Sequence, residues 1–254
     1  MAFYDSYNYR HYWKNREYEN RAETIALQKL FQLIPQKKKK NILDIGAGFG
    51  RHTPLYAPLF KKAILIDPSV KLLSQAQKNL RHHPNLSFKR GEGQKIPLKN
   101  QGVDVVLLIR VIHHLENPSS TLGEITRILK PQGFLILEFA NKVHFKAKIK
   151  AIVHRDWQFF SKIAPSDRRS PKNIKSRSIA FLNYHPQAIK EALQQKGLKI
   201  IKKLSVSNFR SPILKKILPL NYLLLLEKIT QPLLAPLNFG PSIFILAVPT
   251  PSLP

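Results

Sequence analysis

The sequence predicts a doubly wound α/β fold built on a seven-stranded, mostly parallel sheet. Short apolar segments recur along the chain, helix-like patterns separate most of them, and several end at a glycine or an acidic residue. The segments are apolar at consecutive positions, which is typical of parallel strands covered by helices on both faces. The expected strands are 41–45, 63–66, 86–88, 103–109, 134–139, 198–201 and 242–248.

Helices are expected before and between these strands. The first covers 18–33, where apolar residues recur at helical spacing and Pro35 ends the run. Further helices are expected at 69–80, 119–130 and 187–196, with Ser119 or Ser120 as the N-cap of the second of these three. An aromatic-rich segment at 4–13 is interpreted as a hydrophobic cap on the domain or as part of a lid over a ligand.

The composition excludes several classes of protein. With 254 residues, of which 43% are hydrophobic, the chain can bury a core, so a disordered protein is excluded. The absence of cysteine excludes disulfides, thiolate metal sites and cysteine nucleophiles. The first residues lack the pattern of a secretory signal, and no uninterrupted apolar run reaches the length of a membrane span. We therefore expect a cytoplasmic protein.

The charge is strongly positive and unevenly distributed. There are 42 Lys+Arg and 15 Asp+Glu, a formal net charge of +27. Residues 142–177 alone contain 11 Lys+Arg and 2 Asp+Glu. Two interpretations remain open, a solvated basic surface or a site for RNA phosphates. The candidate phosphate contacts are Lys146, Lys148, Lys150, Arg168 and Arg169.

A glycine-rich turn follows the first expected strand and indicates a nucleotide-type ligand. It comprises Asp44, Gly46, Gly48 and Gly50, spaced as D-x-G-x-G-x-G. Glycines let the backbone approach a ligand closely, and the helix that follows offers unpaired N–H groups. The dinucleotide fingerprint would need glycine where Arg51 stands, and the phosphate-loop motif is absent. The Asp44 carboxylate would repel a pyrophosphate but attract a cationic ligand.

Acidic residues also follow the second and third expected strands. Asp67 ends the second strand, 23 residues after Asp44, and Glu92-Gly93 follows the third. The carboxyl ends of parallel strands meet at one edge of the sheet, which is where open α/β sheets bind their ligands. We therefore expect these residues to line one site together with the glycine-rich turn.

These motifs, together with the block at 103–141, resemble the class I S-adenosylmethionine-dependent methyltransferases. The branch is the broad one that contains the ubiquinone and menaquinone methylases, and the resemblance covers about residues 18–141 and the last two strands. It implies a Rossmann-like methyltransferase fold with S-adenosyl-L-methionine as cofactor. The implied cofactor-binding residues are Asp44, Gly46, Ala47, Gly48, Gly50, Asp67, Glu92, Gly93 and Arg110.

Each of these residues has a role implied by the resemblance. The glycines would line the methionine part, Asp44 would lie near its amino group, and Asp67 would accept the ribose hydroxyls. Glu92 replaces the family's usual Asp at the adenine amino group, and Gly93 replaces a common Ala. The backbone of Arg110 would lie beside the methionine part.

The candidate catalytic residues are His113 and His114, which follow the fourth strand. One of them could accept a proton from an oxygen or nitrogen nucleophile, or the pair could only pack against the next helix. No metal-ligand spacing is present, so no metal is expected. Methyl transfer from a sulfonium needs mainly alignment of the acceptor and exclusion of water.

We expect one domain over residues 1–254. It consists of an N-terminal cap and helix at 1–36, a cofactor-binding core at 37–141, a basic insertion at 142–180, and the last strands at 181–254 with a hydrophobic insertion at 211–237. Prolines should divide 211–237 into two short helices. That insertion is expected to form a lid or a membrane-surface element, or else to complete the core.

The expected function is methyl transfer to oxygen or carbon of a small or lipid-like acceptor by direct displacement. Two alternatives stay open. The block at 111–115 also resembles tRNA wobble-uridine methyltransferases, so the acceptor could be RNA. The protein could instead bind the cofactor without transferring a methyl group. The expected partners are thus a small or lipid-like substrate, RNA through the basic insertion, and a membrane surface contacted peripherally.

Overall fold

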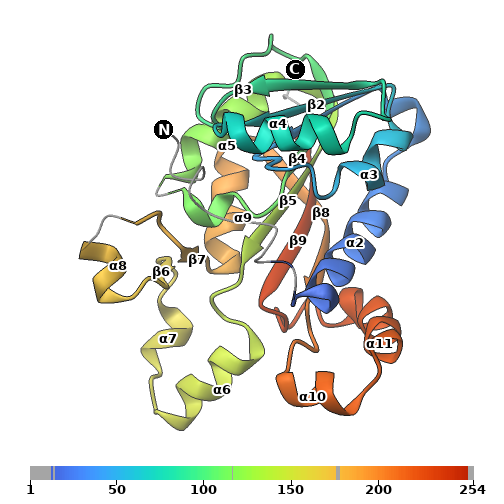
Figure 1. The fold of residues 1–254 in the computed structure, drawn as a ribbon. Helices are drawn as coiled ribbons and strands as arrows, with labels where there is room; N and C mark the ends of the chain where they lie inside the picture. Colours follow the sequence, from blue (N-terminus) through green and yellow to red (C-terminus); the bar gives the residue numbers. More distant parts are fainter. Residues whose placement is uncertain (1–12, 14, 116, 176–177, 251–254) are drawn as a thin grey trace.

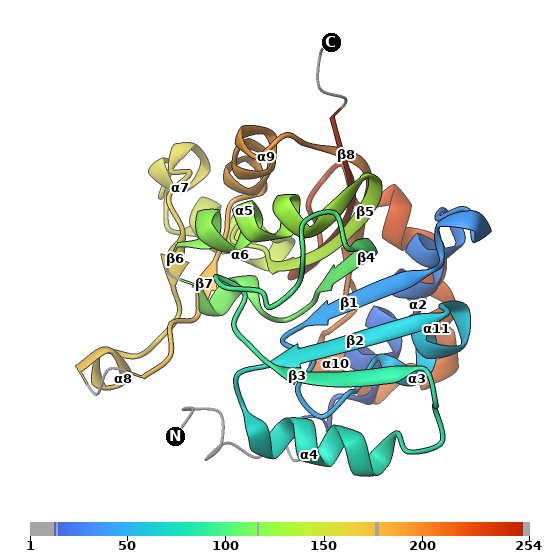
Figure 2. The same cartoon turned by 90° about the horizontal axis from the view of Figure 1, so that it is seen from above.

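The computed structural model describes Trp13 and residues 15–115, 117–175 and 178–250. A seven-stranded sheet forms its centre, in the order β3-β2-β1-β4-β5-β9-β8. Its strands are β1 (Asn41–Ile45), β2 (Lys62–Asp67), β3 (Leu86–Arg90), β4 (Val103–Leu108), β5 (Leu129–Ala140), β8 (Leu198–Val206) and β9 (Ser242–Pro249). Strand β9 runs antiparallel to both neighbours, whereas β1 to β5 pair in parallel (Figure 2). The predicted fold class is therefore confirmed.

Helices cover both faces of the sheet. Helix α2 (Glu17–Gln32) packs on one face, and α5 (Pro118–Ile128) and α9 (Pro186–Gln195) pack on the other (Figure 1). Helix α4 (Val70–Asn79) packs on β2 and β3 through Ala76 and Leu80. This two-sided cover explains why the strands are apolar at consecutive positions.

Two local predictions were wrong around α5. Asn117 caps the helix, because its side chain accepts a hydrogen bond from Ser119 N at 3.0 Å and Pro118 takes the first helical position, so neither Ser119 nor Ser120 is the cap. The helix ends at Ile128 rather than at 130, because Leu129 already pairs with Val103 and starts β5.

Two helical insertions leave the sheet at the same end of its strands. The first follows β5 and contains α6 (Phe145–Val153), α7 (Gln158–Ser161), β6 (Ser166–Asp167), α8 (Pro171–Lys175) and β7 (Leu182–Asn183). The second lies between β8 and β9 and contains α10 (Pro212–Ile217) and α11 (Leu220–Leu233). Because Ser242 pairs with both Ala140 and Val206, both insertions begin at the carboxyl ends of β5 and β8. The predicted division of 211–237 into two helices is confirmed, but only α10 is short. Helix α11 has 14 residues and contains Pro232.

The aromatic segment predicted at 4–13 lies outside the described residues except for Trp13. Among the described residues, no helix is long and apolar enough to cross a membrane.

Candidate functional site

A cavity of about 590 Å³ lies at the carboxyl ends of β1, β2 and β4. Its volume is in the range of cavities that hold small-molecule ligands and cofactors. The described lining is Trp13, 44–49, Arg51, His52, Asp67, Pro68, Leu72, 91–94, 109–111, 113–115, Ser178, Ile179 and Phe181. Of the eleven residues that the sequence indicated for the site, ten therefore line one cavity, and Gly50 does not.

The three glycines of the turn serve different purposes. All have positive φ, 70° at Gly46, 55° at Gly48 and 78° at Gly50, which side chains disfavour. A Cβ on Gly46 would lie 2.3 Å from Val111 Cγ2, and one on Gly50 would lie 2.5 Å from Leu80 Cδ1. A Cβ on Gly48 would meet only Leu72 Cδ1, at 3.9 Å. Gly48 therefore leaves a space open to the cavity, whereas the other two glycines permit close packing.

Asp67 holds this turn from the end of β2. Its carboxylate accepts hydrogen bonds from Gly48 N at 2.9 Å and from Ser69 N at 2.8 Å. The side chain is buried but still lines the cavity. The end of β2 therefore fixes the glycine-rich turn that follows β1.

Asp44, in β1, is a second buried carboxyl that lines the cavity. It accepts a hydrogen bond from Tyr56 Oη at 2.8 Å. Burial raises its pKa to about 7, and the nearby charge of Asp67 contributes in the same direction. An acid poised near neutral pH loses its proton readily when a cation approaches, so this end of the cavity favours a positively charged ligand.

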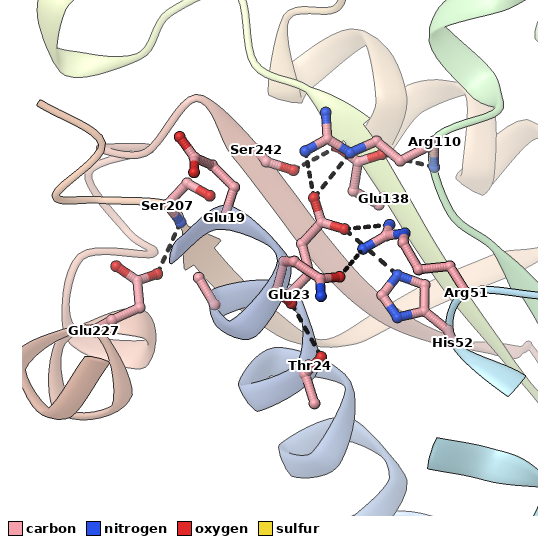
Figure 3. A network of polar contacts seen from close by, with 12 residues as sticks. Glu19, Glu23, Thr24, Arg51, His52, Arg110, Glu138, Ser207, Glu227 and Ser242 are labelled. Atoms are coloured by element: carbon pink, nitrogen blue, oxygen red, sulfur yellow. Dashed lines mark hydrogen bonds and ion pairs between the residues drawn. The ribbon is translucent and has the colours of Figure 1, made fainter. Parts of the chain in front are cut away.

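Glu23 of α2 binds the side chains of two arginines, of which Arg51 directly follows the glycine-rich turn (Figure 3). Its Oε2 accepts a hydrogen bond from Arg51 Nη2 at 2.6 Å, and its Oε1 accepts one from Arg110 Nε at 2.9 Å. His52 Nε2 lies 3.4 Å from Oε2. Burial opposes ionisation of Glu23, but the arginine charges outweigh it and hold the pKa of this carboxyl well below its usual range.

Arg110 connects this cluster to the strands. Its φ is 61°, and its backbone N donates to Glu138 Oε2 at 3.0 Å, while its side chain turns toward Glu23. Trp13 covers the cluster, with its ring centroid 3.7 Å from Arg51 Cζ. Sequence reasoning missed Glu23 and did not assign Arg51 to the site. The sequence did contain one indication of a buried polar site. Glu23 is a carboxylate on the side of α2 that also buries Ala26 and Leu27.

The adenine-site candidates lie after β3. Both Glu92 and Gly93 line the cavity. A Cβ on Gly93 would lie 2.9 Å from Thr121 Cγ2, so a larger residue would push against α5.

His113 and His114 line the cavity after β4, which lies two strands from β2 and Asp67 in the sheet. Their ring centroids are 4.1 Å apart, and Phe181 packs against both rings. Burial holds the pKa of each imidazole below its usual range, so both are neutral at pH 7. His114 Nδ1 lies 2.9 Å from Ala180 O, whereas His113 Nδ1 is buried without a hydrogen-bond partner among the described residues.

Comparison with known proteins gives the family. A family model described as a methyltransferase domain matches residues 43–137. A malonyl-[acyl-carrier protein] O-methyltransferase of Halalkalibacterium halodurans is 30% identical over 128 residues, 46% of this chain and 47% of the relative. The ubiquinone/menaquinone biosynthesis C-methyltransferase UbiE of Rubrivivax gelatinosus is 30% identical over 102 residues, 40% of each chain. Residues 43–137 therefore form a methyltransferase domain of the class I, S-adenosylmethionine-dependent type.

Solved structures agree with the fold of this chain. One from Aquifex aeolicus, titled a SAM-dependent methyltransferase, has a TM-score of 0.56 at 16% identity and covers 90% of this chain and 92% of its own. Another, in a complex with the Haloferax volcanii Trm112 methyltransferase activator, has a TM-score of 0.63 at 18% identity and covers 95% of each chain. The matched stretch spans less than half of the two curated relatives above, so their acceptors do not transfer to this chain.

The cavity residues fit S-adenosylmethionine, the cofactor of this domain family. The open side of Gly48 provides backbone at the cavity wall, and Asp44 favours the positive charge of a sulfonium and an amino group. Among the described residues, no group of three or more histidines or acids is arranged to hold a metal ion.

Proposed function

We propose that this methyltransferase transfers the methyl group of S-adenosylmethionine to an oxygen or carbon atom of a small or lipid-like acceptor. The observation that supports this most is that two sets of residues line one cavity. Asp44, Gly48 and Asp67 lie at or just after the carboxyl ends of β1 and β2, which we call the donor end. His113 follows β4 and Phe181 belongs to the first insertion, and we call this side the acceptor end. The donor supplies an activated methyl group on a sulfonium, so transfer is a direct displacement.

At the donor end, the proposed roles follow the positions of the side chains. Asp44 attracts the cationic methionine part, and Asp67 accepts hydrogen bonds from the ribose hydroxyls while it holds the turn. Glu92 and the backbone of Gly93 bind the adenine from the end of β3. Arg110 lies beside the methionine part, where its bonds to Glu23 and Glu138 fix its backbone.

At the acceptor end, His113 is proposed as the base. A neutral imidazole can take the proton that a hydroxyl acceptor loses as its oxygen bonds to the methyl carbon. Nδ1 of His113 is fully buried, so the ring nitrogen proposed to face an acceptor in the cavity is Nε2. Ile179 and Phe181 give this end an apolar wall, which excludes water and favours an apolar acceptor.

The proposal is tested by incubating the protein with S-adenosylmethionine carrying a labelled methyl group and extracts of small molecules, lipids and RNA. We expect label in the small-molecule or lipid fraction. Once an acceptor is known, His113→Ala should lower kcat by about 10²- to 10⁴-fold without changing donor affinity. Label in the RNA fraction alone would contradict the proposed acceptor class, and donor binding without transfer to any fraction would contradict the activity.

A further inference from the structure

The two helical insertions expose an unusual amount of apolar surface. Among the described residues, nineteen large hydrophobic side chains are exposed, and sixteen of them lie in the insertions after β5 and between β8 and β9. Single exposed apolar side chains are normal on soluble proteins, but a concentration of this kind marks an interaction surface.

Helix α11 has apolar residues on two opposite faces. Its inner face buries Leu223 and Leu224 together with Glu227. Its outer face exposes a stripe at helical spacing, which includes Leu225 and Ile229, exposed by 55% and 54%. The outer stripe therefore has no partner among the described residues.

The inner face fixes α11 without help from the outer stripe. Glu227 accepts hydrogen bonds from Tyr18 Oη at 2.6 Å, from Ser207 N at 2.8 Å and from Asn208 N at 2.9 Å. These bonds attach α11 to α2 and to the end of β8. The outer apolar residues can thus be changed while the helix stays in place.

Helix α6 exposes a second apolar stripe. Phe145, Ile149, Ile152 and Val153 are all exposed, at the spacing of one helix face. Phe145 stacks on Phe239 with ring centroids 4.7 Å apart, and Lys148 Nζ donates to Leu237 O at 2.9 Å. The two insertions therefore touch, and Figure 1 shows α6 and α10 at the same end of the molecule.

The two insertions that carry these apolar stripes are rich in basic residues. Residues 142–177 contain 11 Lys+Arg and 2 Asp+Glu, and 207–241 contain four Lys+Arg and only Glu227 as an acid, which is buried. Lys146, Lys150 and Lys216 are exposed on α6 and α10. Exposed apolar side chains flanked by lysines are typical of helices that lie in the interface of a membrane with anionic lipids.

We infer that α6, α10 and α11 form a docking surface for an anionic lipid bilayer. This basic-apolar surface would repel a second copy of itself, which argues against a dimer through this face. Aliphatic side chains such as Ile149 and Leu225 cannot stack on bases, which argues against RNA as the occupant. Trp157 and Tyr222, exposed by 65% each, are the aromatic types enriched where lipid headgroups meet hydrocarbon.

Two sets of variants test the surface. Leu225→Ser with Ile229→Ser removes part of the outer stripe of α11, and the matched control is Leu33→Ser with Ile201→Ser, two residues exposed by 50% and 48% elsewhere. Lys146→Glu, Lys150→Glu and Lys216→Glu reverse the charge. The matched control for that set changes three exposed lysines outside the insertions to Glu, namely Lys37, Lys78 and Lys190.

Binding is measured by co-sedimentation with vesicles of phosphatidylcholine alone and of phosphatidylcholine with phosphatidylglycerol, without methyl donor or acceptor. We expect the wild type to bind the anionic vesicles, less tightly as salt is raised. Each lysine near such a surface contributes a factor of about five, so the triple reversal should weaken binding at least about 100-fold. The α11 pair should weaken it at least about tenfold.

Several outcomes would overturn the inference. They are absence of vesicle binding by the wild type at low salt, equal losses in the control variants, and a concentration-dependent dimer that the α11 substitutions dissociate. The inference would also be overturned if the lysine reversals weakened RNA binding and left vesicle binding unchanged. Circular dichroism verifies that each variant is folded. Since no step requires methyl transfer, the result is independent of the proposed function.

Among the described residues, none of 211–237 lines the cavity, and the expected lid over the acceptor stays a prediction. The first insertion, by contrast, contributes Ser178, Ile179 and Phe181 to the cavity wall.

Discussion

Glu23→Gln is expected to destabilise the protein strongly. Glu23 is fully buried and contacts two guanidinium groups, Arg51 and Arg110. The substitution keeps the shape of the side chain but removes its charge, which leaves two cations next to each other. Removing one partner of a buried charge pair costs about 3–5 kcal/mol. For a chain of this length, that corresponds to a fall in Tm of roughly 6–20 °C.

The matched control is Glu17→Gln on the same helix. The Glu17 side chain is 66% exposed, and its contact with Arg21 is 3.5 Å long. An exposed pair of this kind contributes about 0.5 kcal/mol or less. Denaturant unfolding of the wild type and both variants at pH 7 measures the difference. Equal effects of the two substitutions would show that the buried charge of Glu23 does not stabilise the fold.

The same variant gives a pH test. The arginines hold the pKa of Glu23 below its usual value of 4.5 in the folded protein. Its carboxylate therefore stabilises the fold above the unfolded-state pKa, and this contribution is lost as pH falls through the folded-state pKa. The gap in unfolding free energy between wild type and Glu23→Gln should thus narrow below about pH 4.5. A gap that stays constant down to the acid transition would show that the charge of Glu23 is not the cause.

The remaining predictions concern the glycines and the donor end of the cavity. Gly46→Ala should destabilise the fold by roughly 1–3 kcal/mol or more, because φ is 70° and the new Cβ would lie 2.3 Å from Val111. Gly123→Ala should stabilise it by about 0.5–1 kcal/mol, because this position in α5 has nothing within 4 Å; denaturant unfolding measures both. Affinity for S-adenosylmethionine should rise with pH through about 7 as Asp44 loses its proton, and Asp44→Asn should remove that dependence in calorimetry at several pH values.

The strands were predictable because burial on both faces leaves uninterrupted apolar segments. The boundary between α5 and β5 was not, since the pairing of Leu129 with Val103 decides it and local sequence does not. The run Leu223–Leu226 also could not be resolved from sequence. Its first two leucines are buried and its last two are exposed, and only the packing of α11 on α2 separates them.

The donor end of the site was predictable from topology, since residues after parallel strands meet at one edge. The cluster around Glu23 was not, because Arg110 lies 87 residues from Glu23 along the chain. The role of Gly50 also could not be predicted from the sequence. Its place in the glycine motif suggested the cavity, but its positive φ and close contact with Leu80 give it a packing role.

The most direct test of the account is calorimetric titration of the protein with S-adenosylmethionine. We expect one binding site for S-adenosylmethionine and no binding of NAD. A hydrogen bond to a charged group contributes roughly 1.5–3 kcal/mol, so Asp67→Ala and Asp67→Asn should each weaken binding about 10- to 150-fold. Asp104→Asn should leave it unchanged, because that buried carboxylate also accepts a backbone N–H, from Asn41 at 3.0 Å, but does not line the cavity. Absence of S-adenosylmethionine binding to the folded wild type, or binding of NAD in its place, would contradict the account.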